Sequence, residues 1–258
     1  MRFASILLLG AAAVSAAFPG EARAAGETRE PAAVAVAQRT LDAMGGAKGF
    51  EALRTLEFEF VVARDGKDVS RWRHAWDRWD GRYRLEGKSK EGKAVLTIFN
   101  VRTPTEGRSW LDGVELTGDP LKRALDYAYN RFINDTYWLL MPAKLLDPGV
   151  NLALEPPATI DGKTFDVVRA TFNDVGLTPK DTYWAYVAKD TGLMDRWEMV
   201  LTGQTAADRS AYTWTAWAQA GPVRLSLLKT AAPGGAFAIR FDNVAGSTSP
   251  DDAAFAAP

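Results

Sequence analysis

The sequence predicts a mainly β protein, built on an antiparallel sheet of about eleven short strands with one helix before it and another in mid-chain. Turn signals recur at close intervals and separate runs rich in Val, Trp, Tyr, Phe and Thr. Such spacing leaves no room for crossover helices, so neighbouring strands should be antiparallel, with one packed and one solvated face. The turn signals are Asp80-Gly81, Glu91-Gly92, Asp112-Gly113, Asp161-Gly162, Asp190-Thr191-Gly192, Ala220-Gly221 and Pro233-Gly234-Gly235.

The first element is a helix predicted from Pro31 to Ala43. Proline suits a first helical turn, and Gly45-Gly46 provides a stop after the last apolar positions. A second short helical turn is expected through Phe50 and Leu53. The period of the pattern then changes to two, which predicts a half-buried strand whose alternating apolar residues are Leu56, Phe58, Phe60 and Val62.

The mid-chain segment from residue 119 to 149 breaks the series of strands. Asp119 can cap a helix entered through Pro120. Apolar residues then recur at helical spacing, at Leu121, Leu125, Ala128 and Phe132. A concentrated apolar run follows from Phe132 to Val150, and we interpret it as a cover over the apolar face of the sheet. Within it, Trp138 to Met141 should form a movable lid bounded by Pro142 and Pro148-Gly149.

The hairpin at Asp80-Gly81 predicts which side chains share a face. A two-residue loop would place Trp76 opposite Leu85, His74 opposite Gly87, and Asp77 opposite Arg84 as a cross-strand ion pair. One face then carries Trp72, His74, Trp76, Tyr83 and Leu85. The other face carries Arg71, Arg73, Asp77, Arg84 and Glu86.

The first 24 residues resemble a secretory signal peptide, with Arg2 before an apolar stretch and Ala22-Arg23-Ala24 as a cleavage pattern. We expect residues 25–258 to form a single mature domain in the periplasm. Without Arg2, Arg23 and Glu21 the formal net charge changes from −1 to −2, which is close to neutral.

No later run reaches the roughly 18 apolar residues that span a bilayer, so we expect no transmembrane segment. The sequence contains no cysteine. This excludes disulfides, thiol nucleophiles and thiolate metal sites, and also the cysteine that lipid anchoring at a cleavage site requires.

Catalytic chemistry finds little support in the sequence. The only histidine, His74, falls on the predicted aromatic face, and no G-x-S-x-G motif is present. One histidine without cysteine cannot build the usual zinc sites, and there is no calcium-binding loop, P-loop or G-x-G-x-x-G. The acidic pairs, such as Asp195 and Glu198, are expected to be solvated. We therefore expect a protein that is not an enzyme, with no catalytic residues, metal or cofactor.

The basic, aromatic stretch RWRHAWDRWDGRYR is also typical of nucleic-acid binding. However, the predicted register sends most arginines and most aromatic residues to opposite faces, and the mature chain has no net positive charge. We expect no nucleic-acid partner.

Several segments resemble the LolA/LolB/LppX-like superfamily of periplasmic lipoprotein-sorting and lipid-carrier proteins. The resemblance rests on the signal, the helix ending in LDAMGGAKGFEALRT, the antiparallel meander, the mid-chain helical insertion and the ending DDAAFAAP. The segments RHAWDRWDGRYRLEG and INDTYWLLMPAKLLDPGV resemble an uncharacterised branch. The resemblance implies a strongly curved, incomplete β-barrel whose hydrophobic concave face is closed by helices and a loop, and which holds acyl chains without catalytic residues.

The leading hypothesis is a monomeric, soluble periplasmic carrier or binding protein for a hydrophobic ligand, a lipid or the acyl chains of a lipidated protein, with envelope proteins as donor and acceptor. Its cavity and lid residues would be Trp72, His74, Trp76, Leu85, Phe99, Phe132, Tyr137, Trp138, Leu140, Met141 and Trp184. Periodicity cannot separate a lined cavity from a filled core, so an envelope interaction module with a filled core is the alternative. A hydrolase that uses His74 is a third possibility.

Overall fold

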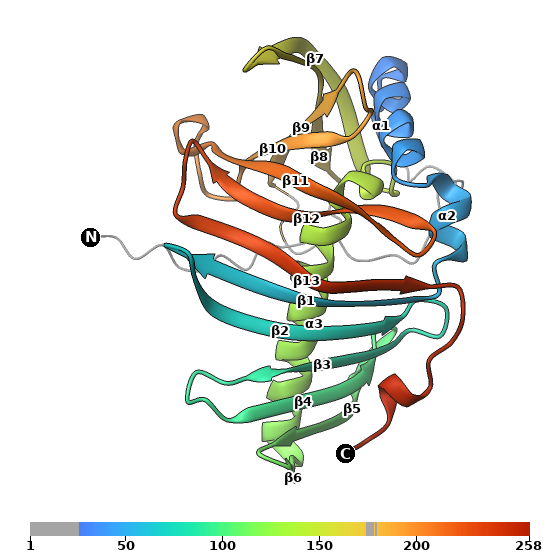
Figure 1. Cartoon of the computed structure of the whole chain (residues 1–258), viewed down its shortest axis with the longest axis vertical. Coiled ribbons are helices and arrows are strands. Elements are labelled where there is room, and N and C mark those ends of the chain that lie inside the picture. The colour runs from blue at the N-terminus through green and yellow to red at the C-terminus, as the bar shows by residue number, and fades with distance from the viewer. Residues whose placement is uncertain (1–25, 174–177, 179) are drawn as a thin grey trace. The chain divides into compact units, whose positions relative to one another are not determined.

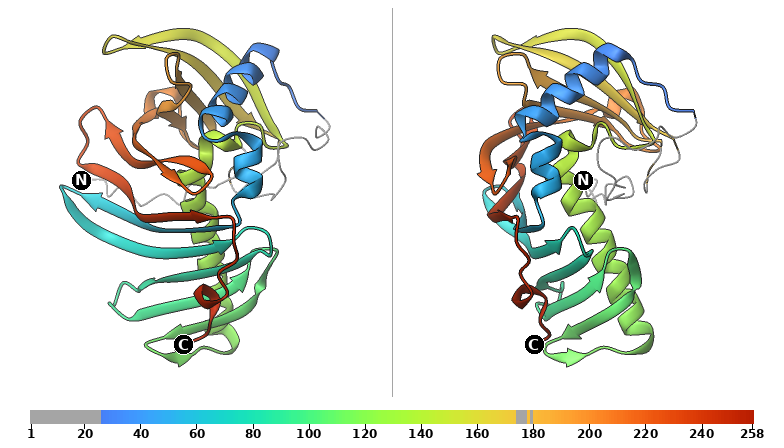
Figure 2. Two further views of the ribbon diagram at one scale, coloured as in Figure 1. Left: turned by 45° about the vertical axis from the view of Figure 1, so that its right-hand side comes forward. Right: turned by 90° about the vertical axis from the view of Figure 1, so that its right-hand side faces the viewer.

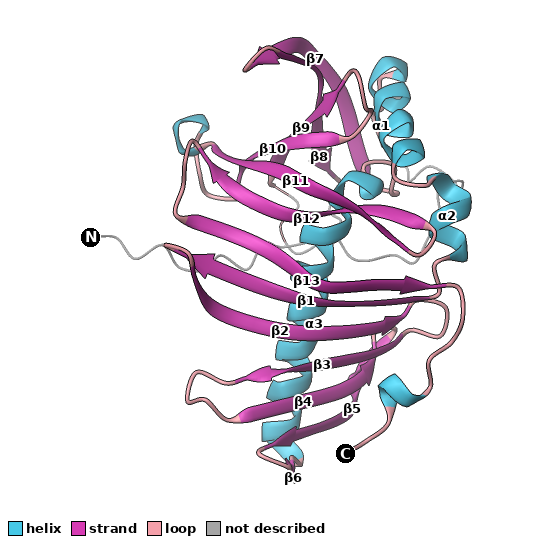
Figure 3. Cartoon of the chain, viewed as in Figure 1, coloured by secondary structure: helices cyan, strands magenta, loops and turns pink. Residues whose placement is uncertain are grey.

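Strands dominate the structure (Figure 3), a computed structural model that describes residues 26–173, 178 and 180–258. Thirteen strands are hydrogen-bonded in the order β6-β5-β4-β3-β2-β1-β13-β12-β11-β10-β9-β8-β7, and the sheet does not close. The predicted fold class is therefore confirmed: a mainly β, antiparallel, curved and unclosed sheet with an N-terminal and a mid-chain helix. Among the described residues there are thirteen strands rather than about eleven. The predicted signal peptide lies outside the described residues.

Contacts divide the chain into two compact units. The first unit comprises residues up to Thr40 together with Ile133–Ser210, and the second comprises Leu41–Phe132 together with Ala211–Pro258. That residues 25–258 form one domain stays a prediction.

In the second unit, hairpins connect β1 to β6 in chain order, and β13 pairs with β1 (Figure 1). The pairing of β13 with β1 brings the C-terminal strand of the chain beside the first strand. The elements are α2 (Gly46–Ala52), β1 (Thr55–Arg64), β2 (Lys67–Asp77), β3 (Arg82–Lys88), β4 (Ala94–Asn100), β5 (Thr103–Leu111), β6 (Val114–Glu115), β11 (Ser210–Ala220), β12 (Val223–Ala232), β13 (Phe237–Ser247) and a 3-10 turn (Ala253–Phe255).

The mid-chain helix α3 (Gly118–Leu140) has Asp119 in its first turn, as expected. It continues beyond Phe132, so the beginning of the predicted cover is helical. The part of α3 up to Phe132 belongs to the second unit, where it crosses one face of strands β1 to β5 (Figures 1 and 2).

The first unit contains the predicted N-terminal helix, with the predicted bounds, beside β7 and β8 (Figure 2). Arg39 of this helix forms an ion pair with Asp166 of β8 at 2.6 Å. Thr28 and Glu30 form backbone hydrogen bonds to Leu152 at the edge of β7. The elements are α1 (Pro31–Ala43), a 3-10 turn (Met141–Lys144), β7 (Val150–Ile160), β8 (Lys163–Phe172), β9 (Thr182–Ala188), β10 (Met194–Val200) and a 3-10 turn (Ala206–Asp208).

In the described parts of both units, none of the helices combines the length and the hydrophobicity needed to cross a membrane.

The β2–β3 hairpin departs from the predicted register. Trp76 pairs with Tyr83 and His74 with Leu85, because the connection is longer than two residues. Asp77 explains the longer turn: its carboxylate accepts hydrogen bonds from the backbone N–H groups of Trp79 and Asp80, both at 3.1 Å. The register is shifted by two residues, so each side chain keeps its predicted face.

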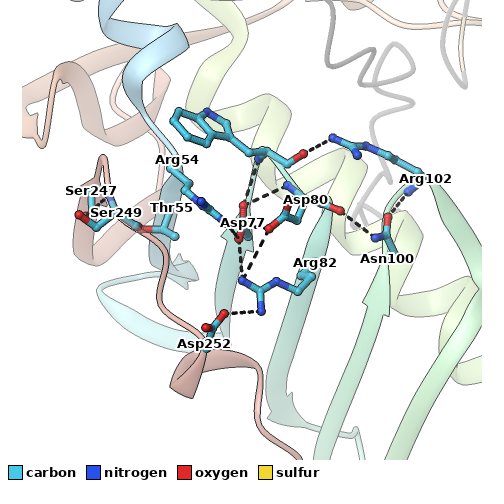
Figure 4. Close-up of polar contacts among 11 residues, drawn as sticks. Arg54, Thr55, Asp77, Asp80, Arg82, Asn100, Arg102, Ser247, Ser249 and Asp252 are labelled. Carbon is cyan, nitrogen blue, oxygen red and sulfur yellow. Dashed lines mark hydrogen bonds and ion pairs between the residues drawn. The ribbon is translucent and has the colours of Figure 1, made fainter.

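The predicted ion pair between Asp77 and Arg84 is wrong. The Asp77 carboxylate instead accepts hydrogen bonds from Arg54 at 3.3 Å and Arg82 at 2.8 Å (Figure 4). Arg82 also contacts Asp252 in the C-terminal segment at 2.7 Å. Through these contacts the hairpin turn links both Arg54, which precedes β1, and the C-terminal segment around Asp252 to the sheet.

Candidate functional site

The candidate site is the face of the second unit's sheet that meets α3, here called the inner face. Backbone pairing places His74 beside Leu85, and places Trp76, Tyr83 and Phe99 in one row across β2, β3 and β4. The predicted site residues Trp72, His74, Trp76, Leu85, Phe99 and Phe132 are all buried in this unit. Phe132 reaches the face from α3, where its ring lies 5.1 Å from that of Trp76 and 4.8 Å from that of Tyr83.

An aromatic row continues along the inner face across the other strands. The His74 ring stacks on Phe58 at 4.5 Å, and Phe58 lies 5.7 Å from Phe241 of β13. The side-chain nitrogen of Lys229 then lies 4.3 Å from the ring centres of both Phe241 and Trp214. The aromatic row, in order, is Phe99, Tyr83, His74, Phe58, Phe241 and Trp214.

Two glycines of the inner face make close approach possible. A Cβ on Gly87 would lie 2.5 Å from the Trp72 ring, so only glycine lets that indole lie against β3. A Cβ on Gly107 would lie 2.9 Å from Leu125 of α3 and 2.5 Å from the carbonyl oxygen of Ile98. The helix therefore depends on this glycine for its distance from β5.

Helix α3 is buried very differently along its length. From Gly118 to Phe132, the only buried residues are Leu125, Ala128 and Phe132, a single stripe at helical spacing. From Ile133 to Pro142 every residue is buried. The first half of α3 thus covers the inner face with three buried side chains and with the more exposed Tyr127, Tyr129 and Arg131, which contact Trp72, Phe99 and Phe60. The second half is enclosed in the first unit.

The predicted lid residues lie in this enclosed half. Tyr137 packs against Tyr183 of β9, and Trp138 lies 4.8 Å from Trp197 of β10. Leu140 and Met141 are also buried. Burial raises the pKa of the Tyr137 and Tyr183 phenols above their ordinary value. These contacts describe a packed cluster, and its role in ligand binding stays a prediction.

Trp184 lies apart from the other predicted residues of its unit. On β9, Tyr183 points to the cluster with Tyr137, whereas Trp184 is only partly buried and packs with Phe165 and Val167. The Arg209 guanidinium lies 3.7 Å from the centre of its ring.

His74 is fully buried, and its Nδ1 lies 2.6 Å from the Tyr83 hydroxyl. The stacked Phe58 ring covers one face of the imidazole. These contacts are typical of a hydrogen-bonded histidine that packs among aromatic side chains. Within the described ranges, no group of three or more His, Asp or Glu side chains could hold a metal ion.

The sequence prediction missed Lys229, as well as Phe241 and Trp214, on this face. Lys229 is fully buried, donates a hydrogen bond to the carbonyl oxygen of Ser226, and contacts two aromatic rings. Burial lowers the pKa of its amine well below the ordinary value. The alternation of Val223, Leu225 and Leu227 in β12 places Lys229 on the apolar face, so a period of two could have identified it.

The opposite face of β1, β2 and β13 is polar. Arg73 pairs with Glu57 at 3.0 Å, and Arg240 pairs with Asp242 at 2.6 Å. A pocket of about 290 Å³ on this side is lined by Glu57, Phe58, Glu59, Arg73 and Asn243. Its charged side chains form ion pairs with one another or with Arg71, so this pocket does not present an apolar binding surface.

No protein-family model and no curated protein matches the sequence. Among solved structures, a LolA superfamily protein from Nitrosomonas europaea matches with a TM-score of 0.50 at 9% identity, covering 87% of this chain and 97% of that one. A DUF1329 family protein from Desulfovibrio piger has a TM-score of 0.44 at 12% identity, covering 87% and 97%. The lipoprotein LppX from Mycobacterium tuberculosis has a TM-score of 0.33 at 13% identity, covering 78% and 94%.

At these identities the comparison concerns the fold alone. The first of these structures matches 87% of the chain at a TM-score of 0.50, which supports the fold as a whole. The chain therefore has a LolA-like fold.

Proposed function

We propose that this protein is a carrier of a hydrophobic ligand, a lipid or the acyl chains of a lipoprotein. The ligand would bind between the inner face of the second unit and the first half of α3. The observation that carries this proposal is the contrast in burial along α3: from Gly118 to Phe132 only Leu125, Ala128 and Phe132 are buried, whereas from Ile133 onward the helix is fully buried. A helix held in this way can separate from an aromatic face at one end while staying fixed at the other.

Burial of apolar surface supplies the binding energy. Each buried methylene contributes about 0.8 kcal/mol, so a chain of sixteen carbons gains on the order of 10 kcal/mol before ordering costs are subtracted. The aromatic row provides the matching surface, and its members are already withdrawn from water in the closed protein. The function needs no catalytic group, and His74 acts as part of the wall.

The proposal includes export. The signal-like residues 1–24 would direct the chain to the periplasm, where the mature protein acts as a soluble monomer without a lipid anchor. Donor and acceptor proteins of the envelope would deliver and receive the ligand. The LolA-like fold supports a lipid or lipoprotein as cargo only by analogy of architecture.

Native mass spectrometry of the protein purified from its own envelope tests the carrier function. We expect a population with additional mass that organic extraction removes, leaving the protein mass unchanged. Identification of the extract by lipid mass spectrometry names the cargo. Recovery of ligand-free protein alone, together with failure to take up any lipid after extraction, would contradict the proposal.

Hydrogen exchange tests the releasable cover. In ligand-free protein, we expect backbone amides of residues 119–132 to exchange at least about tenfold faster than those of 133–142, because few buried side chains hold the first half. Peptide-resolved mass spectrometry measures both halves in one sample, so the second half is an internal control. Equal protection of the two halves would show that α3 opens only as a whole, against the mechanism proposed.

A further inference from the structure

Resting on the proposed carrier function, we propose that Lys229 is the head-group site of the ligand, which is an aliphatic acid whose carboxylate the Lys229 amine binds. The acyl chain would extend from Lys229 along the aromatic row toward Phe99, beneath the first half of α3. The proposal therefore assigns both a chemical class and an orientation to the cargo.

The position of Lys229 supports this assignment. Backbone pairing places Lys229 beside Trp214 on β11 and beside Ile239 on β13. Ile239 and Phe241 alternate on β13 with side chains of the opposite face, and Phe241 pairs with Phe60 of β1. Lys229 therefore belongs to the inner face, between Phe241 and Trp214 at the last step of the aromatic row. From β12 to β4 the face spans five strand spacings, or about 24 Å, which suits an extended acyl chain.

The contacts of Lys229 leave hydrogen-bonding capacity. A bound carboxylate would favour the protonated amine, which has three N–H donors, of which Lys229 uses one on the Ser226 carbonyl. Its other contacts are the rings of Trp214 and Phe241, and among the described residues it forms no ion pair. Two N–H donors match the two oxygens of one carboxylate, which would complete a charge-assisted pair.

An ordinary apolar core gives no reason for this lysine. Burial of an amine without an acidic partner is unfavourable, and methionine fills a similar volume without that penalty. Lysines reach the surface wherever their stems allow, yet the side chain of Lys229 is fully buried. An amine that lowers the stability of the ligand-free protein but pairs with a bound acid is typical of a binding site.

The test compares two ligands of equal chain length in the full-length mature protein after lipid extraction. Palmitate carries the carboxylate, and methyl palmitate lacks its charge. Wild-type protein should bind palmitate about tenfold or more tightly, the value of one hydrogen bond to a charged group. With palmitate labelled at its carboxyl carbon, the ¹³C resonance should shift on binding.

Variants identify the amine responsible. Lys229→Met should abolish the preference for the acid while methyl palmitate still binds, and the ligand-free variant should melt at a higher temperature than wild type. Arg224→Met is the matched control, because it removes one positive charge from the exposed side of the same strand. That control should keep the preference for palmitate.

The outcomes separate this inference from the carrier function. Equal affinity of wild type for acid and ester overturns the carboxylate site and leaves the carrier function standing. Failure of wild type to bind either ligand overturns the carrier function itself. A preference for phosphatidylglycerol vesicles over palmitate that Lys229→Met removes would overturn the carboxylate in favour of a phosphate. The comparison of palmitate with methyl palmitate in wild-type protein tests the carboxylate site even if the Lys229 variant does not fold.

Discussion

Asp77→Ala should lower the free energy of unfolding by roughly 3 kcal/mol, near the lower end of the range for removing one partner of a buried ion pair. The Asp77 side chain is fully buried and accepts hydrogen bonds from Arg54, Arg82 and two backbone amides of the turn. The two arginines keep the partners Asp80 and Asp252, which moderates the loss. Urea unfolding followed by circular dichroism measures the change.

Asp252→Ala is the matched control, because it removes another acidic partner of Arg82. The Asp252 side chain is 82% exposed, so this substitution should cost less than about 1 kcal/mol. Similar losses for Asp77→Ala and Asp252→Ala would show that the buried carboxylate has no special role in the hairpin turn.

The same carboxylate predicts a pH dependence. Burial raises the pKa of Asp77, but hydrogen bonds from Arg82, the Asp80 amide and Arg54 outweigh it and hold the pKa below the ordinary 3.8. The stabilisation is therefore complete above pH 3.8 and is lost as the pH falls through the lower folded-state value. Asp77→Asn should show a weaker loss of stability over this acid range than wild type.

Phe132→Ala should destabilise the protein by about 3–5 kcal/mol, the usual cost of truncating a buried phenylalanine. Phe132 is 1% exposed and ends the buried stripe by which the first half of α3 contacts the inner face. Its ring is T-shaped against both Trp76 and Tyr83, so truncation leaves a cavity between helix and sheet. Chemical denaturation measures the loss, and hydrogen exchange should accelerate in residues 119–132.

Tyr127→Ala is the control on the same helix. Tyr127 lies 5.4 Å from the Trp72 ring but is 46% exposed, so its truncation should cost less than about 1.5 kcal/mol. A loss as large as that of Phe132→Ala would mean that the cover is held by its exposed edge rather than by its buried stripe.

Local signals predicted the elements of this fold well. Pro31 and Gly45-Gly46 predict both ends of α1, and Asp119-Pro120 predicts the first turn of α3. These signals act within a few residues of the positions that they determine, so no tertiary information is needed. The continuation of α3 beyond Phe132 was missed, because every residue there, including the polar Asn134, Asp135 and Thr136, is buried, so the segment has no exposed face to reveal a helical period.

The hairpin register shows the opposite case. Asp80-Gly81 has the composition of a two-residue turn, but Asp77 accepts the amides of Trp79 and Asp80 and so favours a longer one. Which turn forms depends on Arg54 and Arg82, and Arg54 is distant in the sequence. The faces were nevertheless predicted correctly, because a shift of two residues preserves the alternation of side chains.

The candidate site was predicted in part. Alternation identified Trp72, His74 and Trp76 as one face, and the structure brings these residues together with Leu85, Phe99 and Phe132. Lys229 was missed because lysine is expected at the surface, although its place in the alternation of β12 was visible. Trp184 and Tyr183 lie on opposite faces of β9, and no local turn signal indicates which of the two faces packs against Tyr137.

The three buried side chains on the first half of α3 limit how often this part of the helix separates from the sheet in the ligand-free protein. Leaving the sheet exposes at least Leu125, Ala128 and Phe132, which costs roughly 4–7 kcal/mol of hydrophobic free energy. At about 1.4 kcal/mol for each factor of ten, the open form has a population of at most roughly 10⁻³ to 10⁻⁵. The apparent affinity is reduced by the same factor, so the protein rejects short apolar molecules and retains only ligands long enough to outweigh closure.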